Sequence, residues 1–136
     1  MPKTKVVRRE FLKSAARAGA VLTLPTMVPA TVLGKDGAVP PSEKILVGGI
    51  GIQGRGMSDL QWIMGEPDVK FLAICDLQKK QRLVVKNHVD TQYGNKDCAM
   101  YPEIRAFLAE RTDLDAVLIA TGDRWHAMAS ILAMRA

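Results

Sequence analysis

The sequence predicts an α/β fold, a doubly wound parallel sheet of the Rossmann type with about four strands. Short apolar runs rich in β-branched residues alternate with stretches of helical periodicity, which is typical of βα units wrapped around a parallel sheet. A glycine-rich turn follows the first apolar run directly and leads into a helix, as in folds that bind nucleotides at their strand ends. With 136 residues the chain has room for one domain.

The predicted elements follow one another without interruption after residue 43. Buried strands are expected at 44–50, 69–75 and 116–120, and a short third strand is expected at 98–101. Helices are expected at 57–64, 78–92, 102–111 and 125–136. Gly65 and Pro67 end the first of these helices, and Pro102 is expected in the first turn of the third.

The net charge of +5 comes entirely from the N-terminus. Residues 1–30 carry six basic side chains and one acidic one, so residues 31–136 hold 13 of each sign. A nucleic-acid-binding surface would need a basic folded part, and this class of function is therefore excluded. The two cysteines form no C-x-x-C pair, and Cys75 is expected as a small buried core residue, so no metal site is predicted.

The first thirty residues are expected to be a targeting segment. Arg8-Arg9-Glu10-Phe11-Leu12-Lys13 resembles the R-R-x-F-L-K core of twin-arginine export signals, although Val7 replaces the usual Ser or Thr. An apolar stretch, 18–28, leads to a small-residue cleavage site ending at Ala30. This reading implies the twin-arginine export machinery as a partner and a periplasmic or other extracytoplasmic location, with 31–42 as a linker. An amphipathic basic helix or a frayed N-terminus is the alternative.

The glycine turn is the first candidate ligand site. Gly51 and Gly56 fit the first and third glycines of G-x-G-x-x-G, with Gln53 in the middle position and Gly54 beside it. Such a turn keeps side chains away from a pyrophosphate seated at the N-terminus of the following helix. A second frame, which starts at Gly49, matches the pattern in full but places a glycine inside the strand. The candidate cofactor contacts are Gly51, Ile52, Gln53, Gly54, Arg55 and Gly56.

Asp76 is the second candidate. It lies 25 residues after Gly51, at the end of the second predicted strand, where a carboxylate accepts the ribose hydroxyls of a bound adenosine. Such a carboxylate repels the 2′-phosphate of NADP, so NAD is the expected cofactor and NADP the less favoured one. The alternative role for Asp76 is an ordinary helix N-cap.

The fourth predicted strand and the loop after it read Asp115-Ala-Val-Leu-Ile-Ala-Thr-Gly-Asp-Arg-Trp-His-Ala127. This resembles the Gfo/Idh/MocA family of oxidoreductases, whose fourth strand commonly ends D-A-V-x-[IV]-A-T-P-D-x-W-H-A. Gly51–Gly56 and Ala73–Asp76 are similar to two further motifs of the family. The resemblance implies that Thr121, Asp123, Trp125 and His126 line the nicotinamide side of the cofactor site.

The chain departs from the family pattern at two of these positions. Gly122 replaces the usual Pro, and Arg124 stands where His is frequent, which makes the loop less rigid than its relatives. Judged without the resemblance, Trp125 and His126 are packing residues at a helix start. His88 is expected to be a surface or half-buried histidine.

The resemblance implies a sheet order of 3-2-1-4 and a function. Residues 43–136 are expected to be part of a nucleotide-binding domain, within an exported oxidoreductase that transfers hydride between NAD and a hydroxyl of a sugar or cyclitol. The family continues into a Glu-Lys-Pro strand end and a second domain with the substrate pocket. The chain has neither, so we expect a truncated domain with an exposed fourth strand, and we name no catalytic residue.

Two alternatives stay open. Some exported relatives use tightly held NAD for transient oxidation during glycoside cleavage, and a non-exchanging cofactor with release of free sugar would distinguish them. The other alternative is a binding or assembly module without catalysis, or the inactive product of a truncated gene. An in-frame Glu-Lys-Pro codon run downstream would restore the enzyme reading. No oligomeric state is predicted.

Overall fold

The computed structural model describes residues 39–136. The expected export signal, 1–30, and the linker up to residue 38 lie outside this part of the chain. The elements are a 3-10 helix η3 (Pro41–Glu43), then β1 (Ile45–Ile50), α2 (Arg55–Gly65), β2 (Val69–Cys75), α3 (Lys79–Tyr93), β3 (Ala99–Tyr101), α4 (Ile104–Glu110), β4 (Ala116–Ile119) and α5 (Asp123–Arg135).

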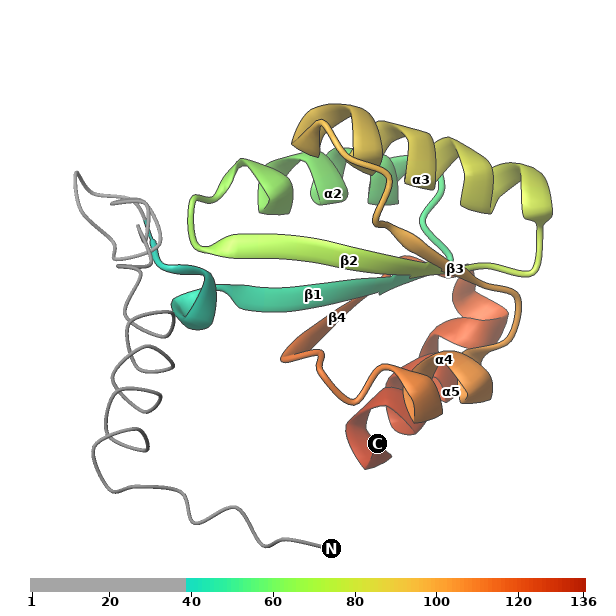
Figure 1. The fold of residues 1–136 in the computed structure, drawn as a ribbon. Coiled ribbons are helices and arrows are strands. Elements are labelled where there is room, and N and C mark those ends of the chain that lie inside the picture. The colour runs from blue at the N-terminus through green and yellow to red at the C-terminus, as the bar shows by residue number, and fades with distance from the viewer. Residues whose placement is uncertain (1–38) are drawn as a thin grey trace, which may run out of the picture.

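The four strands form one parallel sheet in the order β3-β2-β1-β4. This confirms the predicted fold class and strand order. Helices α2 and α3 cover one face of the sheet, and α4 and α5 cover the other (Figure 1). The chain first winds outward from β1 to β3 and then returns to add β4 on the other side of β1. The carboxyl ends of β1 and β4 therefore flank the point where the winding reverses, the usual place for a ligand crevice in such sheets.

Each face of the sheet has its own hydrophobic core. The core under α2 and α3 is built around Leu60, Phe71 and Val85, and the core under α4 and α5 is built around Ile50 and Phe107. All five of these side chains are essentially fully buried. Because β1 and β2 lie in the middle of the sheet, their residues enter both cores, which explains why these strands read as continuous apolar runs.

Strand β2 contains one residue more than its partner. The pairing runs Val47 with Phe71 and then Gly48 with Ala73, so the register shifts at Leu72. The hydroxyl of Tyr93, at the end of α3, accepts a hydrogen bond from the Phe71 backbone N–H at 3.0 Å. The side chain thereby satisfies a backbone donor next to the irregularity, where sheet hydrogen bonds are interrupted.

The element boundaries agree with the predicted ones to within two residues, and the largest differences lie at helix starts. Helix α4 begins at Ile104, so Pro102 precedes the helix and does not lie in its first turn. The Glu103 side chain accepts a hydrogen bond from the Ala106 backbone N–H at 2.9 Å and caps this helix. Helix α5 begins at Asp123, two residues earlier than expected, because the Gly122 carbonyl already accepts hydrogen bonds from the Trp125 and His126 backbone N–H groups.

A polar cluster fixes the connection between α3 and β3. The ammonium group of Lys86 lies 2.8 Å from a carboxylate oxygen of Asp90. It also donates to the backbone carbonyls of Lys96 and Cys98. The other carboxylate oxygen of Asp90 accepts from the Cys98 backbone N–H at 3.0 Å. Burial raises the pKa of Asp90, but these hydrogen bonds and the lysine charges outweigh it and lower the pKa below its ordinary value of 3.8.

Replacing this carboxylate is expected to destabilise the fold in a pH-dependent way. A carboxyl group with a lowered folded-state pKa stabilises the fold above its unfolded pKa and loses this effect as the pH falls through the folded value. Asp90→Asn should therefore lower the free energy of unfolding by about 1 kcal/mol at neutral pH. Urea unfolding of the wild type and the variant at neutral pH measures this difference in the free energy of unfolding. Repeated in acid, below the pKa of the carboxyl, the measurement should show no difference.

The matched control is Asp97→Asn, an exposed carboxylate in the same connection that bonds to the Asn95 side chain. This variant should unfold like the wild type at both pH values. If Asp90→Asn lowered the free energy of unfolding by the same amount in acid as at neutral pH, the charged carboxylate would not be the source of the stabilisation.

Candidate functional site: a cleft at the strand ends

A cleft of about 380 Å³ opens at the carboxyl ends of the strands. Its lining comes from the turns after β1, β2, β3 and β4 and from the first part of α5. Of the residues predicted to bind a cofactor, the structure brings five together here: Gly51, Gln53, Asp76, Thr121 and Trp125. Segments as far apart in the sequence as Gly51 and Trp125 thus contribute to one site.

Two glycines allow the glycine turn to approach the end of β4. Gly51 has a positive φ of 67°, and a Cβ atom on it would lie 2.4 Å from Cγ2 of Thr121. A Cβ atom on Gly56, in the first turn of α2, would lie 2.5 Å from Cβ of Ala120. These are the roles of the first and third glycines in nucleotide-binding turns, where one makes the tight turn and the other brings helix and strand together.

The alternative frame of the glycine motif is wrong for a packing reason. Gly49 lies within β1, and a Cβ atom there would meet Cδ1 of Ile52 at 2.3 Å and Cζ of Phe71 at 2.8 Å. The space that a side chain at Gly49 would need is occupied by Ile52 and Phe71 in the core, so this glycine serves core packing and does not face a ligand. Gly54, at the helix N-cap, has a φ of 49° and open space around it.

The other turn residues have different orientations. The Ile52 side chain is fully buried and anchors the turn in the core below α2. Arg55 points away from the cleft: its guanidinium lies 3.0 Å from Asp59 on the same helix and 5.2 Å from the ring centre of Trp62. Ile52, Gly54, Arg55 and Gly56 do not line the cleft. The side chains of Ile52 and Arg55 therefore do not contribute to the cleft surface.

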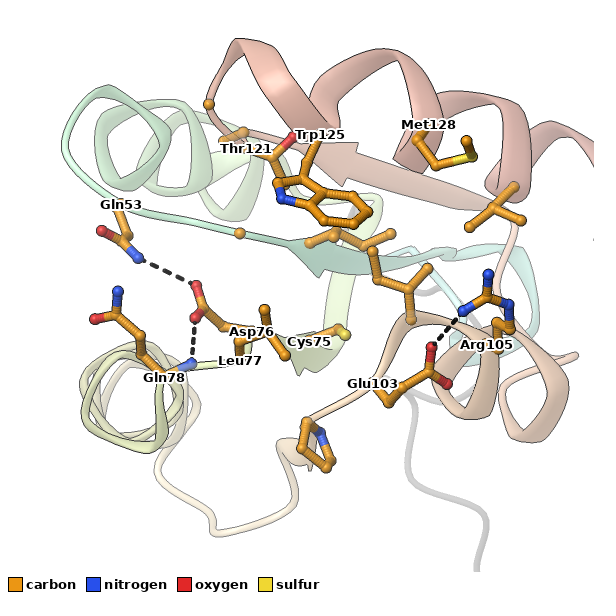
Figure 2. Close-up of a pocket in the computed structure, with 17 residues that line it drawn as sticks. Gln53, Cys75, Asp76, Leu77, Gln78, Glu103, Arg105, Thr121, Trp125 and Met128 are labelled. Carbon is orange, nitrogen blue, oxygen red and sulfur yellow. Dashed lines mark hydrogen bonds and ion pairs between the residues drawn. The ribbon is translucent and has the colours of Figure 1, made fainter.

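Asp76 is the only buried charged residue in the described part of the chain, with 8% of its surface exposed. One carboxylate oxygen accepts from the Gln78 backbone N–H at 2.7 Å, and the other from the Gln53 side-chain amide at 3.3 Å (Figure 2). The guanidinium of Arg82 donates to the backbone carbonyls of Asp76 and Leu77. The helix-cap alternative for Asp76 is wrong, because α3 begins at Lys79 with Gln78 as its N-cap.

The loop after β4 brings one polar and one aromatic side chain to the cleft. The hydroxyl oxygen of Thr121 is buried and has no hydrogen-bond partner among residues 39–136. Trp125 lies beside it above the cleft, with its indole 59% exposed (Figure 2). An unpaired buried hydroxyl is costly unless a ligand or water completes its hydrogen bonds. Thr121 therefore marks a place where a polar ligand group fits.

Asp123 and His126, predicted to line the nicotinamide side, are exposed on the first turn of α5 and do not line the cleft. The backbone N–H of His126 bonds to the Gly122 carbonyl at 3.1 Å and its carbonyl accepts from Ser130. His88 is half-buried as expected, and its Nε2 atom has no partner in the part of the chain described here.

Several cleft residues were not predicted. The far end of the cleft is apolar, lined by Ile104, Met128 and Leu132, with Glu103 and Arg105 paired at 3.3 Å beside it (Figure 2). Met128 and Leu132 are four residues apart on a helix, which is the only sequence signal that pointed to a shared face.

Cys75 lies in the floor of the cleft but is unsuited to act as a nucleophile. Its side chain is buried. Burial, together with the nearby carboxylates of Glu103 and Asp76, raises the pKa of the thiol to about 12 against a smaller opposing effect of Arg82. The reactive thiolate is therefore scarce at neutral pH. Within residues 39–136, no three His, Cys, Asp or Glu side chains gather to bind a metal ion, and no helix is long and apolar enough to cross a bilayer.

No family model matches the chain. It is similar to curated proteins named glycosyl hydrolase family 109 protein. The one from Solibacter usitatus is 27% identical over 135 residues, and the one from Shewanella pealeana is 32% identical over 143 residues. In both cases the match covers 96% of this chain and 31% of the relative. The chain thus spans about a third of the length of these relatives.

Solved structures share the fold. Myo-inositol dehydrogenase from Lactobacillus casei, in complex with NAD(H) and myo-inositol, matches with a TM-score of 0.57 and 17% identity. An NAD-binding protein from Listeria innocua matches with a TM-score of 0.54 and 25% identity. A Gfo/Idh/MocA family oxidoreductase from Vibrio cholerae matches with a TM-score of 0.51 and 18% identity. Each match covers 68% of this chain, and 25–27% of the other.

The chain has the fold of the NAD-binding part of a Gfo/Idh/MocA oxidoreductase. The resemblance read from the sequence is thereby confirmed, and the partial coverage agrees with a match to the N-terminal part of such proteins. The four-stranded order and the flanking helices are those of the Gfo/Idh/MocA nucleotide-binding domain.

The close approach that shapes this cleft makes Gly56 sensitive to substitution. Gly56→Ala should lower the free energy of unfolding by about 1–3 kcal/mol, because the added methyl group overlaps Ala120 and must push α2 from β4. The matched control is Gly65→Ala at the other end of α2, where a Cβ atom meets nothing within 4 Å. Urea unfolding should show no loss for the control, and equal losses in both variants would contradict the packing argument.

Proposed function

We propose that the cleft binds NAD(H), and that the chain is the nucleotide-binding part of an oxidoreductase that acts on a hydroxyl of a sugar or cyclitol. One observation carries this proposal: a glycine turn at the N-terminus of α2 and the buried carboxylate of Asp76 face the same cleft at the strand ends. A dinucleotide needs both features, one for its pyrophosphate and one for its adenosine ribose.

The geometry of the residues fits such a ligand. Gly54, at the N-cap of α2, has no side chain and has open space around it, so a pyrophosphate can reach the start of the helix. Each oxygen of the Asp76 carboxylate has one hydrogen bond, and a carboxylate oxygen can accept about two. Capacity for two ribose hydroxyls therefore remains. The same carboxylate would repel a 2′-phosphate, which supports NAD over NADP.

The residues of this chain would bind and orient the cofactor. NAD, when bound, supplies the hydride acceptor, and the protein supplies position and electrostatics. The buried hydroxyl of Thr121 would hydrogen-bond to the ligand, and the exposed ring of Trp125 would cover it from solvent. Asp123 and His126 would contribute after substrate or further chain approaches α5.

A second candidate function is NAD-dependent glycoside cleavage without net oxidation. The names of the curated relatives, all called glycosyl hydrolase family 109 proteins, favour it. Both candidates share the nucleotide site and differ in how the cofactor is used. Under either, we propose that the protein is exported by the twin-arginine route, on the strength of Arg8-Arg9 and the residues up to Lys13.

Titration of the full chain with NAD and NADP tests the nucleotide site. NAD should bind with micromolar to low-millimolar affinity and more tightly than NADP. Asp76→Ala removes the acceptor of two ribose hydrogen bonds and should weaken NAD binding by about tenfold to a hundredfold. The control Glu110→Ala changes an exposed carboxylate at the opposite end of α4 and should bind like the wild type. A folded chain that binds no NAD, or prefers NADP, would contradict the proposal.

Cofactor retention separates the two candidates. A dehydrogenase with net conversion of NAD to NADH must exchange its cofactor in every turnover, so native mass spectrometry of the dialysed chain should show no NAD. Retention of one NAD per chain through dialysis would instead favour the glycoside-cleaving function, in which the cofactor returns to its starting state.

A further inference from the structure

Two glutamine amides connect the glycine turn to the turn after β2. The side chain of Gln81, in the first turns of α3, donates to the backbone carbonyl of Ile52 at 2.8 Å. In the opposite direction, the side chain of Gln53 crosses from the glycine turn to the carboxylate of Asp76 (Figure 2). The two bonds join residues 29 and 23 positions apart in the sequence, so neither belongs to local secondary structure.

The glycine turn needs such support. Gly51 and Gly54 have positive φ angles, and glycine loses more conformational freedom on folding than any other residue. Within the turn, the Gly56 backbone N–H bonds to the Gln53 carbonyl at 2.8 Å. This bond closes the turn but does not set its position relative to Asp76. The Gly51 backbone N–H donates to the Cys75 carbonyl at 2.8 Å and fixes the start of the turn beside β2. The amides of Gln81 and Gln53 add side-chain connections at the next two residues of the turn, Ile52 and Gln53.

We propose that Gln81 and Gln53 together set the distance between the glycine turn and Asp76, and so make the cleft selective for ligands with both a diphosphate and a ribose. This inference rests on the proposed nucleotide-binding function. A ligand that contacts both turns gains from their fixed separation, because the ordering cost is already met in the free protein. A nucleoside without phosphate contacts only the turn that carries Asp76, so the fixed separation of the two turns does not strengthen its binding.

The two glutamines have separable roles. Gln53 lines the cleft and contacts the Asp76 carboxylate directly, so its replacement changes the ligand surface itself. Gln81 does not line the cleft and acts only through the Ile52 carbonyl. Gln81 is therefore a positioning residue, and it is the better one to test.

The same helix offers a matched control. Gln92, near the end of α3, also donates its side-chain amide to a backbone carbonyl of the neighbouring segment, that of Met64, at 3.4 Å. This second bond connects α3 to the far end of α2, away from the cleft. Gln81→Met and Gln92→Met remove equivalent bonds and keep a good helix-forming residue of similar length.

Titration of the full chain with ADP-ribose and with adenosine, followed by NMR, tests the proposal. In Gln81→Met the dissociation constant of ADP-ribose should rise about threefold to tenfold, the range expected for one lost hydrogen bond. That of adenosine should change less than twofold. In Gln92→Met both ligands should bind as in the wild type. Equal weakening of both ligands by Gln81→Met, or no weakening of ADP-ribose, overturns the selectivity.

Amide hydrogen exchange without ligand separates this inference from the proposed function. The segment 51–57 should exchange faster in Gln81→Met than in the wild type or in Gln92→Met, since the turn has lost its connection to α3. Unchanged exchange of this segment overturns the positioning role whether or not nucleotides bind. If the segment exchanges faster in Gln81→Met but the wild type binds neither ADP-ribose nor adenosine, the positioning role of Gln81 stands. The nucleotide-binding function on which the selectivity rests is then refuted.

Discussion

The first turn of α2 and the end of β4 approach each other to a distance that excludes side chains, and the geometry of the cleft follows from this contact. Thr121 and Ala120 occupy the space in which Cβ atoms of Gly51 and Gly56 would lie. Because β4 pairs with β1, which leads into the same glycine turn, strand pairing and helix packing meet at one point. The loop after β4 is thereby placed beside the glycine turn, and Trp125 beside both.

The fold was largely predictable, because its two central strands, β1 and β2, enter the cores on both faces of the sheet and read as uninterrupted apolar runs. Val69–Cys75 was predicted to the residue. The helix starts were less predictable, since they depend on which side chain or carbonyl satisfies the first backbone N–H groups. Glu103 caps α4 from a position that carried no sequence signal, and the Gly122 carbonyl starts α5 before the aromatic residue that seemed to open it.

Some residues of the candidate site could also be predicted from the sequence, and others could not. Gly51 and Asp76 were found because turn and strand end fix their positions through the backbone. Gln81 and Arg82 were missed, because their partners are backbone carbonyls in other turns and no spacing rule reports such contacts. Asp123 and His126 were placed in the site by resemblance alone, and the helix start at Asp123 leaves both side chains outside the cleft lining.

The extra residue in β2 decides which side of the sheet each later residue faces. Phe71 enters the core under α2 and α3, whereas Ala73, two positions on, enters the opposite core, so the alternation is inverted across Leu72. A one-residue slip exchanges the two faces of a strand. If Leu72 were instead paired in regular alternation, Ala73, Ile74 and Cys75 would each face the opposite layer, and Asp76 after them would be displaced in the same way. The side of the sheet on which the end of β2 meets the cleft thus depends on one irregularity a few positions before Asp76, and the Tyr93 hydroxyl satisfies the backbone N–H beside it.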